Sequence, residues 1–293
     1  MNLEPIRSLI KRALDEDRVF NDVTTRAICA PCRNIKGSFI IKENGIVCGL
    51  DVAREIFSVI GSRMKAKNKG GVSFKSIIKD GSSVRKNQVI ADVKGPAEVL
   101  LGAERTTLNF MQRLSGIATL TSRYVKEAEP YGVKIYDTRK TTPGLRYLEK
   151  YAVRCGGGFN HRMSMEDMVL IKDNHLALLA KNAIISDTIK EIKSKVPKKI
   201  KIEVETENLG QIREVLEAEA DIIMLDNMAS GKLREAVNFI KTMRYKGKPL
   251  IEVSGGIRLR DVKRIARLGV DRIAVGALTH SAAALDISLE ITS

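Results

Sequence analysis

The stretch IKIEVETENLGQIREVLEAEADIIMLD, residues 200–226, contains two apolar runs, at 200–205 and 221–226, with a helical pattern between them. This order is typical of two parallel strands joined by a crossover helix. Similar runs occur at 133–138, 168–172, 249–254 and 271–275, and a helical pattern follows each of them. The six runs begin 35, 32, 21, 28 and 22 residues apart, which is the spacing of successive βα units. The sequence therefore predicts a parallel sheet of six strands.

Polar residues or glycines follow nearly every one of these six runs. They are Arg139 and Lys140, Lys172, Glu205, Asp226, Ser254 with Gly255 and Gly256, and Gly276. An open sheet binds its ligand mainly at one switch point, whereas a barrel brings the carboxyl ends of all its strands to one mouth. We therefore predict an α/β barrel, and an incomplete one because only six strands are evident.

The first half of the chain has a different pattern. Residues 3–17 and 51–60 have the apolar spacing of helices, and short strand-like runs occur at 36–42, 45–49 and 72–79. Glycines punctuate these short elements. The mixture predicts a small α/β sandwich.

Residues 97–128 carry an apolar stripe at helical spacing. We expect Ser115-Gly116 to separate two helices within this stretch. Arg105 lies beside Glu104 amid the apolar pattern, so it is either a partner of that local carboxylate or a residue of an interface or active site.

Composition limits the classes of protein to which the chain can belong. Its 293 residues, 44% hydrophobic and 29% charged, are enough for a barrel with a smaller partner domain. The net charge of +15 favours negatively charged partners. Aromatic residues make up only 4%, Trp is absent and zinc-finger spacing is missing, and these features disfavour nucleic acid.

Four cysteines, Cys29, Cys32, Cys48 and Cys155, occur without a signal peptide or an apolar run long enough to cross a bilayer. We therefore expect a cytoplasmic protein. Cys29 and Cys32 have the spacing of half a zinc site, but no second pair or neighbouring His completes it. We interpret them as two ordinary thiols.

Five cationic residues in the stretch 134–175 stand at the predicted ends of regular elements: Arg139, Lys140, His161, Arg162 and Lys172. Cations placed just after a strand or before a helix can converge on one ligand. The pattern predicts a pocket for a small, highly anionic substrate.

Two turns in this stretch favour that prediction. In DTRKTTPG, residues 137–144, Thr142 is suited to cap a helix that begins at Pro143, so that a helix amino end would face the two cations. Three glycines at 156–158 precede His161. They either allow tight backbone geometry near a bound group or form a flexible hinge.

Carboxylates follow two adjacent strand runs. Glu205 and Asp226 suit Mg²⁺ shared with phosphate oxygens, or electrostatic stabilisation of a cationic transition state. Glu203, Glu207 and Glu252 compete for the same role. Because side chains alternate along a strand, Glu203 and Glu205 share a face, and the pattern does not choose between them.

Small residues follow the last two strand runs, in SGGI at 254–257 and VGALTHSA at 275–282. Their backbone N–H groups can approach a phosphate closely, as in the phosphate sites of barrels. Thr279, His280 and Ser281 are further possible donors.

These motifs resemble those of the quinolinate phosphoribosyltransferases, also called carboxylating nicotinate-nucleotide pyrophosphorylases. The resemblance covers DVTT at 22–25, ERTTLNFMQRLSGIATLT at 104–121, and then, in order, DTRKTTPGLR, GGGFNHRM, KDNH, EVE, LDN, SGGI and VGALTHS. Asn87 departs from the pattern at a turn where the family often has glycine. The family converts quinolinate and 5-phosphoribosyl 1-pyrophosphate to nicotinate mononucleotide, pyrophosphate and CO₂ in NAD biosynthesis, with Mg²⁺ and without an organic cofactor.

The resemblance implies an α/β sandwich with a dimer-contact helix at 1–112, an incomplete α/β barrel at 113–276, and a carboxy-terminal segment at 277–293 that packs back on the first domain. It also implies a homodimer, or a higher oligomer, with shared active sites.

The resemblance assigns site residues by motif and selects Glu205 over Glu203. Those implied to bind quinolinate are Arg105 of a second subunit, Thr138, Arg139, His161, Arg162 and Lys172. Those implied to bind the phosphoribosyl pyrophosphate are Lys140, Glu205, Asp226, Ser254, Gly255, Gly256, Val275, Gly276, Ala277 and His280. Lys140, Glu205 and Asp226 would be catalytic, and the two carboxylates would hold Mg²⁺, mainly through substrate and water.

Two alternatives stay open. A related phosphoribosyltransferase-like protein could keep the barrel and use another base, although the full set of cations disfavours it. A noncatalytic anion- or RNA-binding module could exploit the positive charge, although Glu205 and Asp226 beside the cations disfavour that function.

Overall fold

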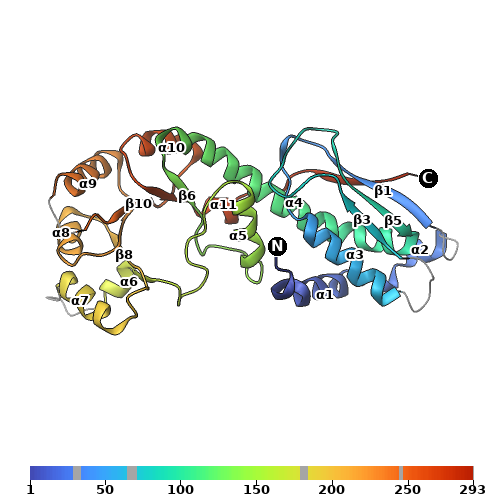
Figure 1. Cartoon of the computed structure of the whole chain (residues 1–293), viewed down its shortest axis with the longest axis horizontal. Helices are drawn as coiled ribbons and strands as arrows, with labels where there is room; N and C mark the ends of the chain where they lie inside the picture. The colour runs from blue at the N-terminus through green and yellow to red at the C-terminus, as the bar shows by residue number, and fades with distance from the viewer. Residues whose placement is uncertain (29–33, 65–70, 179–183, 244–246, 293) are drawn as a thin grey trace. The chain divides into compact units, whose positions relative to one another are not determined.

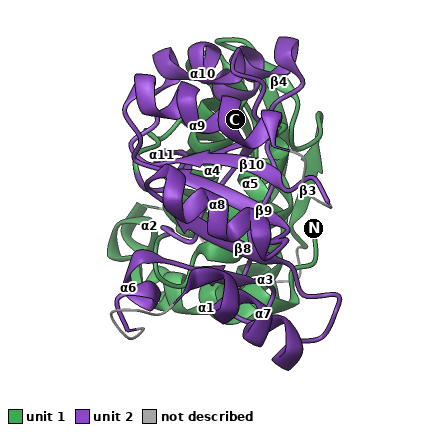
Figure 2. Cartoon of the chain, turned by 90° about the vertical axis from the view of Figure 1, so that its left-hand side faces the viewer, with its two compact units in different colours: residues 1–122, 142–157, 281–293 green, residues 123–141, 158–280 purple. Residues whose placement is uncertain are grey.

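The computed structural model describes residues 1–28, 34–64, 71–178, 184–243 and 247–292. Cys29 and Cys32, which we interpreted as ordinary thiols, lie outside the described residues. The chain divides into two compact units, shown in Figure 2. Unit 1 contains residues 1–122, 142–157 and 281–293, and unit 2 contains residues 123–141 and 158–280.

Unit 1 is built on an antiparallel sheet with the order β12-β1-β5-β3 (Figure 1). Its strands are β1 (Asn34–Ile41), β3 (Ser73–Ser76), β5 (Val89–Pro96) and β12 (Ile287–Thr292), and a separate pair is formed by β2 (Gly45–Ile46) and β4 (Ser83–Val84). The predicted α/β sandwich is confirmed. The patterns at 36–42, 45–49 and 72–79 correspond to β1, β2 and β3, whereas β5 and β12 had no counterpart among the predicted strands.

Helices accompany this sheet. They are η1 (Glu4–Ile6), α1 (Arg7–Glu16), η2 (Val19–Asn21), α2 (Val23–Ile28), α3 (Leu50–Met64), α4 (Ala97–Ala128) and α5 (Arg146–Cys155). Phe57 of α3 packs against Phe39 of β1 and Phe74 of β3, with ring centroids 5.7 to 6.1 Å apart. These rings fix α3 against the sheet. Asn87 has a φ of 67°, which explains why its turn suits glycine.

Helix α4 is continuous, so the predicted break at Ser115-Gly116 is wrong. A Cβ atom on Gly116 would lie 1.9 Å from the carbonyl oxygen of Ala283, so the glycine permits close backbone contact and does not end the helix. The Ser115 hydroxyl accepts a hydrogen bond from the N–H of Cys48 at 2.9 Å and donates one to its carbonyl at 3.1 Å. Both residues therefore serve packing within unit 1.

Unit 2 contains the predicted parallel sheet of six strands. In chain order they are β6 (Lys134–Tyr136), β7 (Val169–Ile171), β8 (Ile202–Thr206), β9 (Ile222–Asp226), β10 (Leu250–Ser254) and β11 (Arg272–Ala274). Their spatial order is β6-β11-β10-β9-β8-β7, and every pairing is parallel. Because β6 and β7 stand at opposite ends without pairing to each other, the described strands form an incomplete barrel, as predicted.

Helices follow the strands of unit 2. They are η3 (Glu129–Tyr131), α6 (Asp173–Leu176), α7 (Ile185–Lys195), α8 (Leu209–Glu217), α9 (Ser230–Thr242), α10 (Leu259–Ala266) and α11 (Ala277–His280). Figure 1 shows α8, α9 and α10 on the outer side of the curved sheet. Among the described helices of both units, none combines the length and the apolar character needed to traverse a bilayer.

Candidate active site

A cavity of about 390 Å³ lies within unit 2 at the carboxyl ends of the barrel strands. It brings together eleven of the predicted site residues: Thr138, Arg139, Lys140, His161, Arg162, Lys172, Glu205, Asp226, Ser254, Gly255 and Gly256. Leu170, Met224, Asn227, Glu252 and Ala274 complete the lining. Residues from separate strands converge there because parallel strands place their carboxyl ends at one mouth.

Two arginines meet in this cavity. Arg139 follows β6, and its Nε is buried without a hydrogen-bond partner among the described residues. Arg162 donates to the carbonyl of Met168 at 3.1 Å. Burial lowers the pKa of Arg162, and the charge of Arg139 lowers it further. Both side chains line the same cavity. A buried donor beside a second cation indicates a site for an anion.

Asp137 fixes the loop that carries His161. Its fully buried carboxylate accepts hydrogen bonds from the side chain of Asn160 at 2.6 Å and from the N–H of His161 at 2.8 Å. Phe159 is held beside β6, because its N–H donates to Ile135 and its carbonyl accepts from Asp137. The backbone from Phe159 to His161 is therefore tied to the sheet.

The predicted helix start at Pro143 is wrong. Helix α5 begins at Arg146, and the residues before it form a turn in which Gly144 has a φ of 78°. Thr142 instead binds the buried carboxylate of Glu149, through its N–H at 3.0 Å and its hydroxyl at 2.8 Å. The left-handed conformation at Gly144 cannot belong to a helix, so the signal of Thr142 and Pro143 marks a turn.

His161 contacts a buried cluster of charged residues, Glu203, Glu252 and Arg272, which the sequence patterns did not predict. Its Nε2 lies 3.0 Å from Oε2 of Glu203 and 3.6 Å from Oε1 of Glu252. Arg272 lies 2.5 Å from Glu252 and 3.2 Å from Glu203, and its guanidinium stacks over the ring of Tyr136 at 5.0 Å. Both carboxylates are fully buried. These contacts are ion pairs by distance.

This cluster favours the protonated form of His161. Burial lowers the pKa of His161, but the two facing carboxylates outweigh burial and raise the pKa from 6.5 to about 9. The N–H of Arg162 donates to Nδ1 at 2.9 Å, so His161 as it stands here is neutral, with its proton on Nε2. Protonation of Nδ1, which the two facing carboxylates favour, makes His161 a third positive charge beside the two arginines and requires that N–H to move aside. The only feature of the sequence that could have predicted this cluster is a charged residue within each of three apolar strand runs, namely Glu203, Glu252 and Arg272.

Glu203 and Glu205 differ in depth along β8. Glu203 is enclosed among the barrel residues, whereas Glu205 is 8% exposed and lines the cavity. Lys172 lies 3.4 Å from Glu205. Burial raises the pKa of Glu205, Lys172 opposes that rise, and Asp226 adds to it. Glu205 and Asp226 thus form a pair of repelling carboxylates that a cation can bridge.

Close backbone packing shapes the loops after β10 and β9. Gly255 has a φ of 94°, and a Cβ atom there would lie 2.3 Å from the side-chain oxygen of Asn227. Asn227 has a φ of 50° and donates a hydrogen bond to Asp226. Asn227 was not among the predicted site residues. Its position after a strand-end carboxylate is the signal that could have found it.

The loop between β11 and α11 contacts Lys140. The hydroxyl of Thr279 donates to the carbonyl of Lys140 at 2.7 Å, and a Cβ atom on Gly276 would lie 3.3 Å from the side chain of Lys140. Four predicted residues of this loop do not line the cavity: Val275, Gly276, Ala277 and His280. Their loop contacts Lys140, and Lys140 lines the cavity.

Arg105 also does not line the cavity. It is exposed on the part of α4 that belongs to unit 1. It makes no ion pair with Glu104 in the described structure, so the local pairing considered above is absent.

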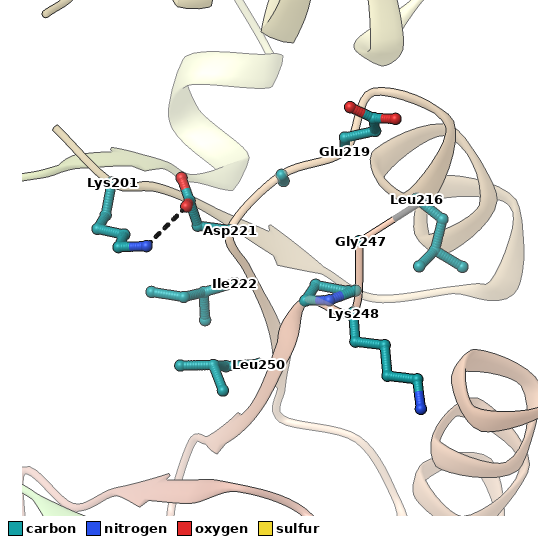
Figure 3. A pocket seen from close by; sticks show the side chains of 10 residues that line it. Lys201, Leu216, Glu219, Asp221, Ile222, Gly247, Lys248 and Leu250 are labelled. Carbon is teal, nitrogen blue, oxygen red and sulfur yellow. Dashed lines mark hydrogen bonds and ion pairs between the residues drawn. The ribbon is translucent and has the colours of Figure 1, made fainter. Parts of the chain in front are cut away.

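A different hollow, of about 540 Å³, lies at the amino ends of the strands in unit 2 (Figure 3). Lys201 and Asp221 form an ion pair there at 2.9 Å, and Asp221 also accepts from the N–H of Ile202. Its other lining residues are mostly apolar side chains and loop residues, among them Leu216, Ile222 and Leu250. Glu219 and Lys248 also line this hollow, but none of the predicted site residues does.

Comparison with known proteins agrees with this geometry. The model of the quinolinate phosphoribosyl transferase N-terminal domain matches residues 22–115, and that of the C-terminal domain matches residues 117–290. Probable carboxylating nicotinate-nucleotide pyrophosphorylases of Methanocaldococcus jannaschii and Bacillus subtilis are 41% and 39% identical. The alignments cover 97% and 100% of this chain, and 96% and 95% of those proteins.

Solved structures give the same result. NadC from Streptococcus pyogenes is 36% identical with a TM-score of 0.89, covering 100% of this chain and 98% of that one. The nicotinate-nucleotide pyrophosphorylase from Francisella tularensis is 36% identical with a TM-score of 0.87 and the same coverage. Family models, relatives and structures all span both units. The chain therefore belongs to the quinolinate phosphoribosyltransferase family.

Proposed function

We propose that the chain transfers the phosphoribosyl group of 5-phosphoribosyl 1-pyrophosphate to quinolinate, with formation of nicotinate mononucleotide, pyrophosphate and CO₂. The observation that carries this proposal is the buried Nε of Arg139, which has no acceptor among the described residues, in a cavity that Arg162 also lines. A planar dicarboxylate supplies oxygen acceptors for both groups. The names of the related pyrophosphorylases support this reaction.

Quinolinate occupies the cationic side of the cavity in this proposal. Arg139 and Arg162 bind its carboxylates together with the protonated His161. Lys172 and the hydroxyl of Thr138 complete this half. The buried Glu203, Glu252 and Arg272 act indirectly, by holding His161 charged and in place.

The phosphoribosyl pyrophosphate occupies the other side. Lys140, which is exposed, faces the pyrophosphate, and Glu205 and Asp226 face the ribose. The 5-phosphate binds the backbone N–H groups of two loops, whose residues are Ser254, Gly255, Gly256, Val275, Gly276, Ala277 and His280. The close approach of backbone at Gly255 and Gly276 supports this role.

Glu205 and Asp226 would also hold a Mg²⁺ ion. Their fit to a cation rests on their mutual repulsion, since Asp226 raises the pKa of Glu205. Oxygen ligands and retained water are what Mg²⁺ prefers. When bound, the ion supplies positive charge to the pyrophosphate oxygens.

The residues of the cavity hold the two substrates in position and balance their negative charge. Quinolinate and the sugar pyrophosphate are both anions, so the cations of the cavity must hold the ring nitrogen against the anomeric carbon. The nitrogen lone pair forms the new C–N bond while the C–O bond breaks and its electron pair leaves with pyrophosphate. Glu205 and Asp226 stabilise the oxocarbenium-like state between these events. The ring, now a cationic pyridinium, accepts the electron pair when the 2-carboxylate leaves as CO₂, and the ring carbon takes up a proton.

The decisive experiment is product analysis with quinolinate labelled with ¹³C in its 2-carboxylate, phosphoribosyl pyrophosphate and Mg²⁺. We expect nicotinate mononucleotide and labelled CO₂ in equal amounts. Nicotinate serves as the control base, because an enzyme for that base gives the mononucleotide without CO₂. Nucleotide from nicotinate but not from quinolinate, or no nucleotide at all, would contradict the proposal.

We also propose a homodimer in which Arg105 of one subunit serves the cavity of the other. The exposure of Arg105 and its lack of an ion pair with Glu104 support this. Subunits with Arg105→Ala and subunits with Lys140→Ala, mixed after dissociation, should regain up to about a quarter of the activity, because a hybrid dimer has one intact site. Hybrid dimers that form without any recovery would refute shared sites. The free thiols Cys48 and Cys155 suit a reducing, cytoplasmic compartment.

A further inference from the structure

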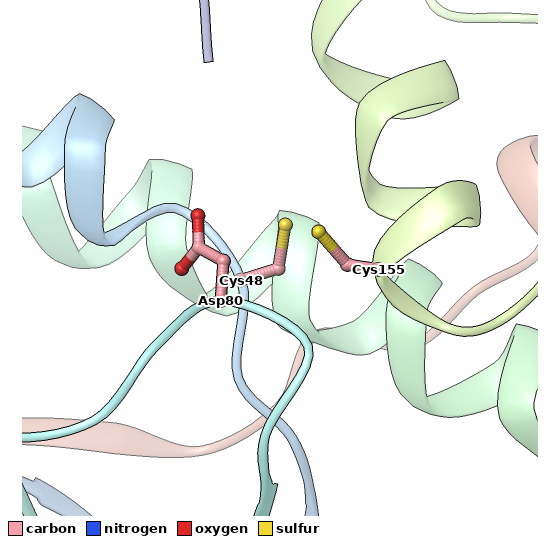
Figure 4. A group of neighbouring side chains, drawn as sticks. All are labelled: Cys48, Asp80 and Cys155. Atoms are coloured by element: carbon pink, nitrogen blue, oxygen red, sulfur yellow. The ribbon is translucent and has the colours of Figure 1, made fainter.

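Three segments of unit 1 bring two thiols and a carboxylate to one point (Figure 4). Cys48 precedes α3, Asp80 lies in the turn between β3 and β4, and Cys155 is the last residue of α5. The two Sγ atoms and a carboxylate oxygen all lie within 4.8 Å of one another. None of these residues belongs to the cavity of unit 2. The known reaction of the family therefore does not account for the cluster.

The backbone around this cluster is fixed on each side. Ser115 holds both the N–H and the carbonyl of Cys48. The N–H of Gly81 donates to the carbonyl of Val47 at 2.8 Å. A Cβ atom on Gly81 would lie 3.3 Å from the carbonyl of Cys155, so the turn packs directly on the end of α5. The three side chains are consequently presented by a rigid frame.

Asp80 is oriented in the manner of a metal-binding carboxylate. One oxygen accepts a hydrogen bond from the N–H of Leu50 at 3.0 Å, and the other accepts from the hydroxyl of Tyr151 at 2.9 Å. The N–H of Gly49 also donates to this carboxylate, whose two oxygens offer about four lone-pair sites and so keep room for a cation. Carboxylates that bind metals are usually held by such second contacts.

The cluster contains no cation of its own. Asp80 makes no ion pair with a described residue, and Cys48 is fully buried with its thiol turned toward Cys155. The buried cluster of Glu203, Glu252 and His161 in unit 2 is a useful contrast. Its ligand atoms are equally close, but Arg272 already supplies its positive charge.

We propose that Cys48, Asp80 and Cys155 form a binding site for one divalent cation of the zinc class. Thiolate sulfur with one carboxylate oxygen suits Zn²⁺ and disfavours Mg²⁺, which prefers oxygen ligands only. Two sulfurs bound tetrahedrally at about 2.3 Å from Zn²⁺ are about 3.8 Å apart. The two sulfurs therefore need to approach each other by no more than about 1 Å.

The fourth position of this site belongs to water. Cys48 is inaccessible, but Asp80 and Cys155 are only half-buried, so the ion can enter from their side. The two thiols release their protons as the metal–sulfur bonds form, and no electron transfer is involved. The bound ion joins the β3–β4 turn, the start of α3 and the end of α5, and it should raise the thermal unfolding midpoint.

The test uses the full chain carrying Cys29→Ser and Cys32→Ser, because that pair also has ligand spacing. The protein is reduced, freed of metal by dialysis under argon, and titrated with Co²⁺ and then Zn²⁺. We expect one Co²⁺ per chain, with thiolate-to-metal charge-transfer and tetrahedral d–d absorption, and displacement by an equal amount of Zn²⁺. The unfolding midpoint should rise with either ion.

Variants in this background locate the ion. Cys155→Ser should weaken Co²⁺ binding by at least about 100-fold and remove the charge-transfer band, and Asp80→Asn should weaken it by about 10- to 100-fold. Both residues are half-buried, so these variants should fold even if Cys48→Ser does not. Tyr151→Phe, which removes one hydrogen bond to Asp80, should weaken binding by about 10-fold.

Two results overturn the proposal. One is a folded, reduced protein with both thiols counted that binds no Co²⁺. The other is binding of the ion by Cys29 and Cys32 instead. In that case the double variant Cys48→Ser and Cys155→Ser, in which Cys29 and Cys32 are intact, still binds the ion, and the variant in which only Cys29 and Cys32 are replaced does not. A chain that holds Cys48 and Cys155 as a disulfide under reducing conditions, and therefore binds no Co²⁺, overturns the proposal as well.

Discussion

Replacing Arg272 with Met tests how much the buried ion pairs of the barrel contribute to the free energy of unfolding. Arg272 is the guanidinium that contacts Glu252 at 2.5 Å and Glu203 at 3.2 Å, and neither carboxylate is exposed. Methionine keeps much of the apolar stem but removes the charge. Removing one partner of a buried ion pair typically costs about 3 to 5 kcal/mol, because the remaining charge stays in a medium of low polarity. We expect Arg272→Met to lower the free energy of unfolding by that amount.

The assay is urea-induced unfolding at pH 7, followed by circular dichroism. A matched control is Lys190→Met, because the Lys190–Asp187 pair is exposed and should change the free energy of unfolding by no more than about 1 kcal/mol. Adding Glu252→Gln to Arg272→Met should recover part of the loss, since it removes one of the unpaired charges. The reasoning fails if Arg272→Met is as stable as the control, or if the double variant is less stable than the single one.

Three further predictions concern the cavity and α4. Arg139→Ala should weaken quinolinate binding by about 2 to 5 kcal/mol, because a carboxylate is left unpaired in the pocket; titration calorimetry showing near-normal affinity would exclude the assignment. Quinolinate affinity should fall as pH rises through about 9, because the raised pKa of His161 means that its charge is present below that pH and lost above it. Affinity of the His161→Gln variant measured from pH 7 to 10 should lack this step, and an unchanged step would assign it to another group. Gly116→Ala should cost about 1 to 3 kcal/mol of folding stability, because its Cβ would collide with a carbonyl oxygen. Gly231→Ala in α9, with nothing within 4 Å, is its control in urea unfolding, and equal effects would contradict the packing argument.

The barrel of unit 2 could be predicted because its signals are local. Apolar runs such as 221–226 specify strands by themselves, and a parallel sheet places their carboxyl ends together whatever their order. This is why Arg139, Lys172 and Glu205, far apart in sequence, were rightly expected near one another. Membership of the family was likewise correctly inferred from motif order.

The remaining features depend on contacts between distant residues. The pairing of Arg272 with Glu203 and Glu252 follows from β8, β10 and β11 lying in one sheet, which no local pattern encodes. Gly116 was read as a helix break because its neighbour Ala283 could not be foreseen. Pro143 is typical both of the first residue of a helix and of a turn. The positive φ of Gly144 shows that it belongs to a turn, and the sequence does not contain that angle.

The position of β12 has a consequence for how the protein is made. This strand pairs with β1 in antiparallel register, from Lys36 opposite Thr292 to Ile41 opposite Ile287, yet it follows all of unit 2 in the chain. Because a ribosome delivers the chain from its amino end, the six strands of unit 2 emerge before the strand that covers β1. During that interval β1 presents an unpaired backbone edge, a surface that invites pairing with another nascent chain. We therefore expect unit 1 to complete its folding last, and chaperones that engage this protein to do so at β1.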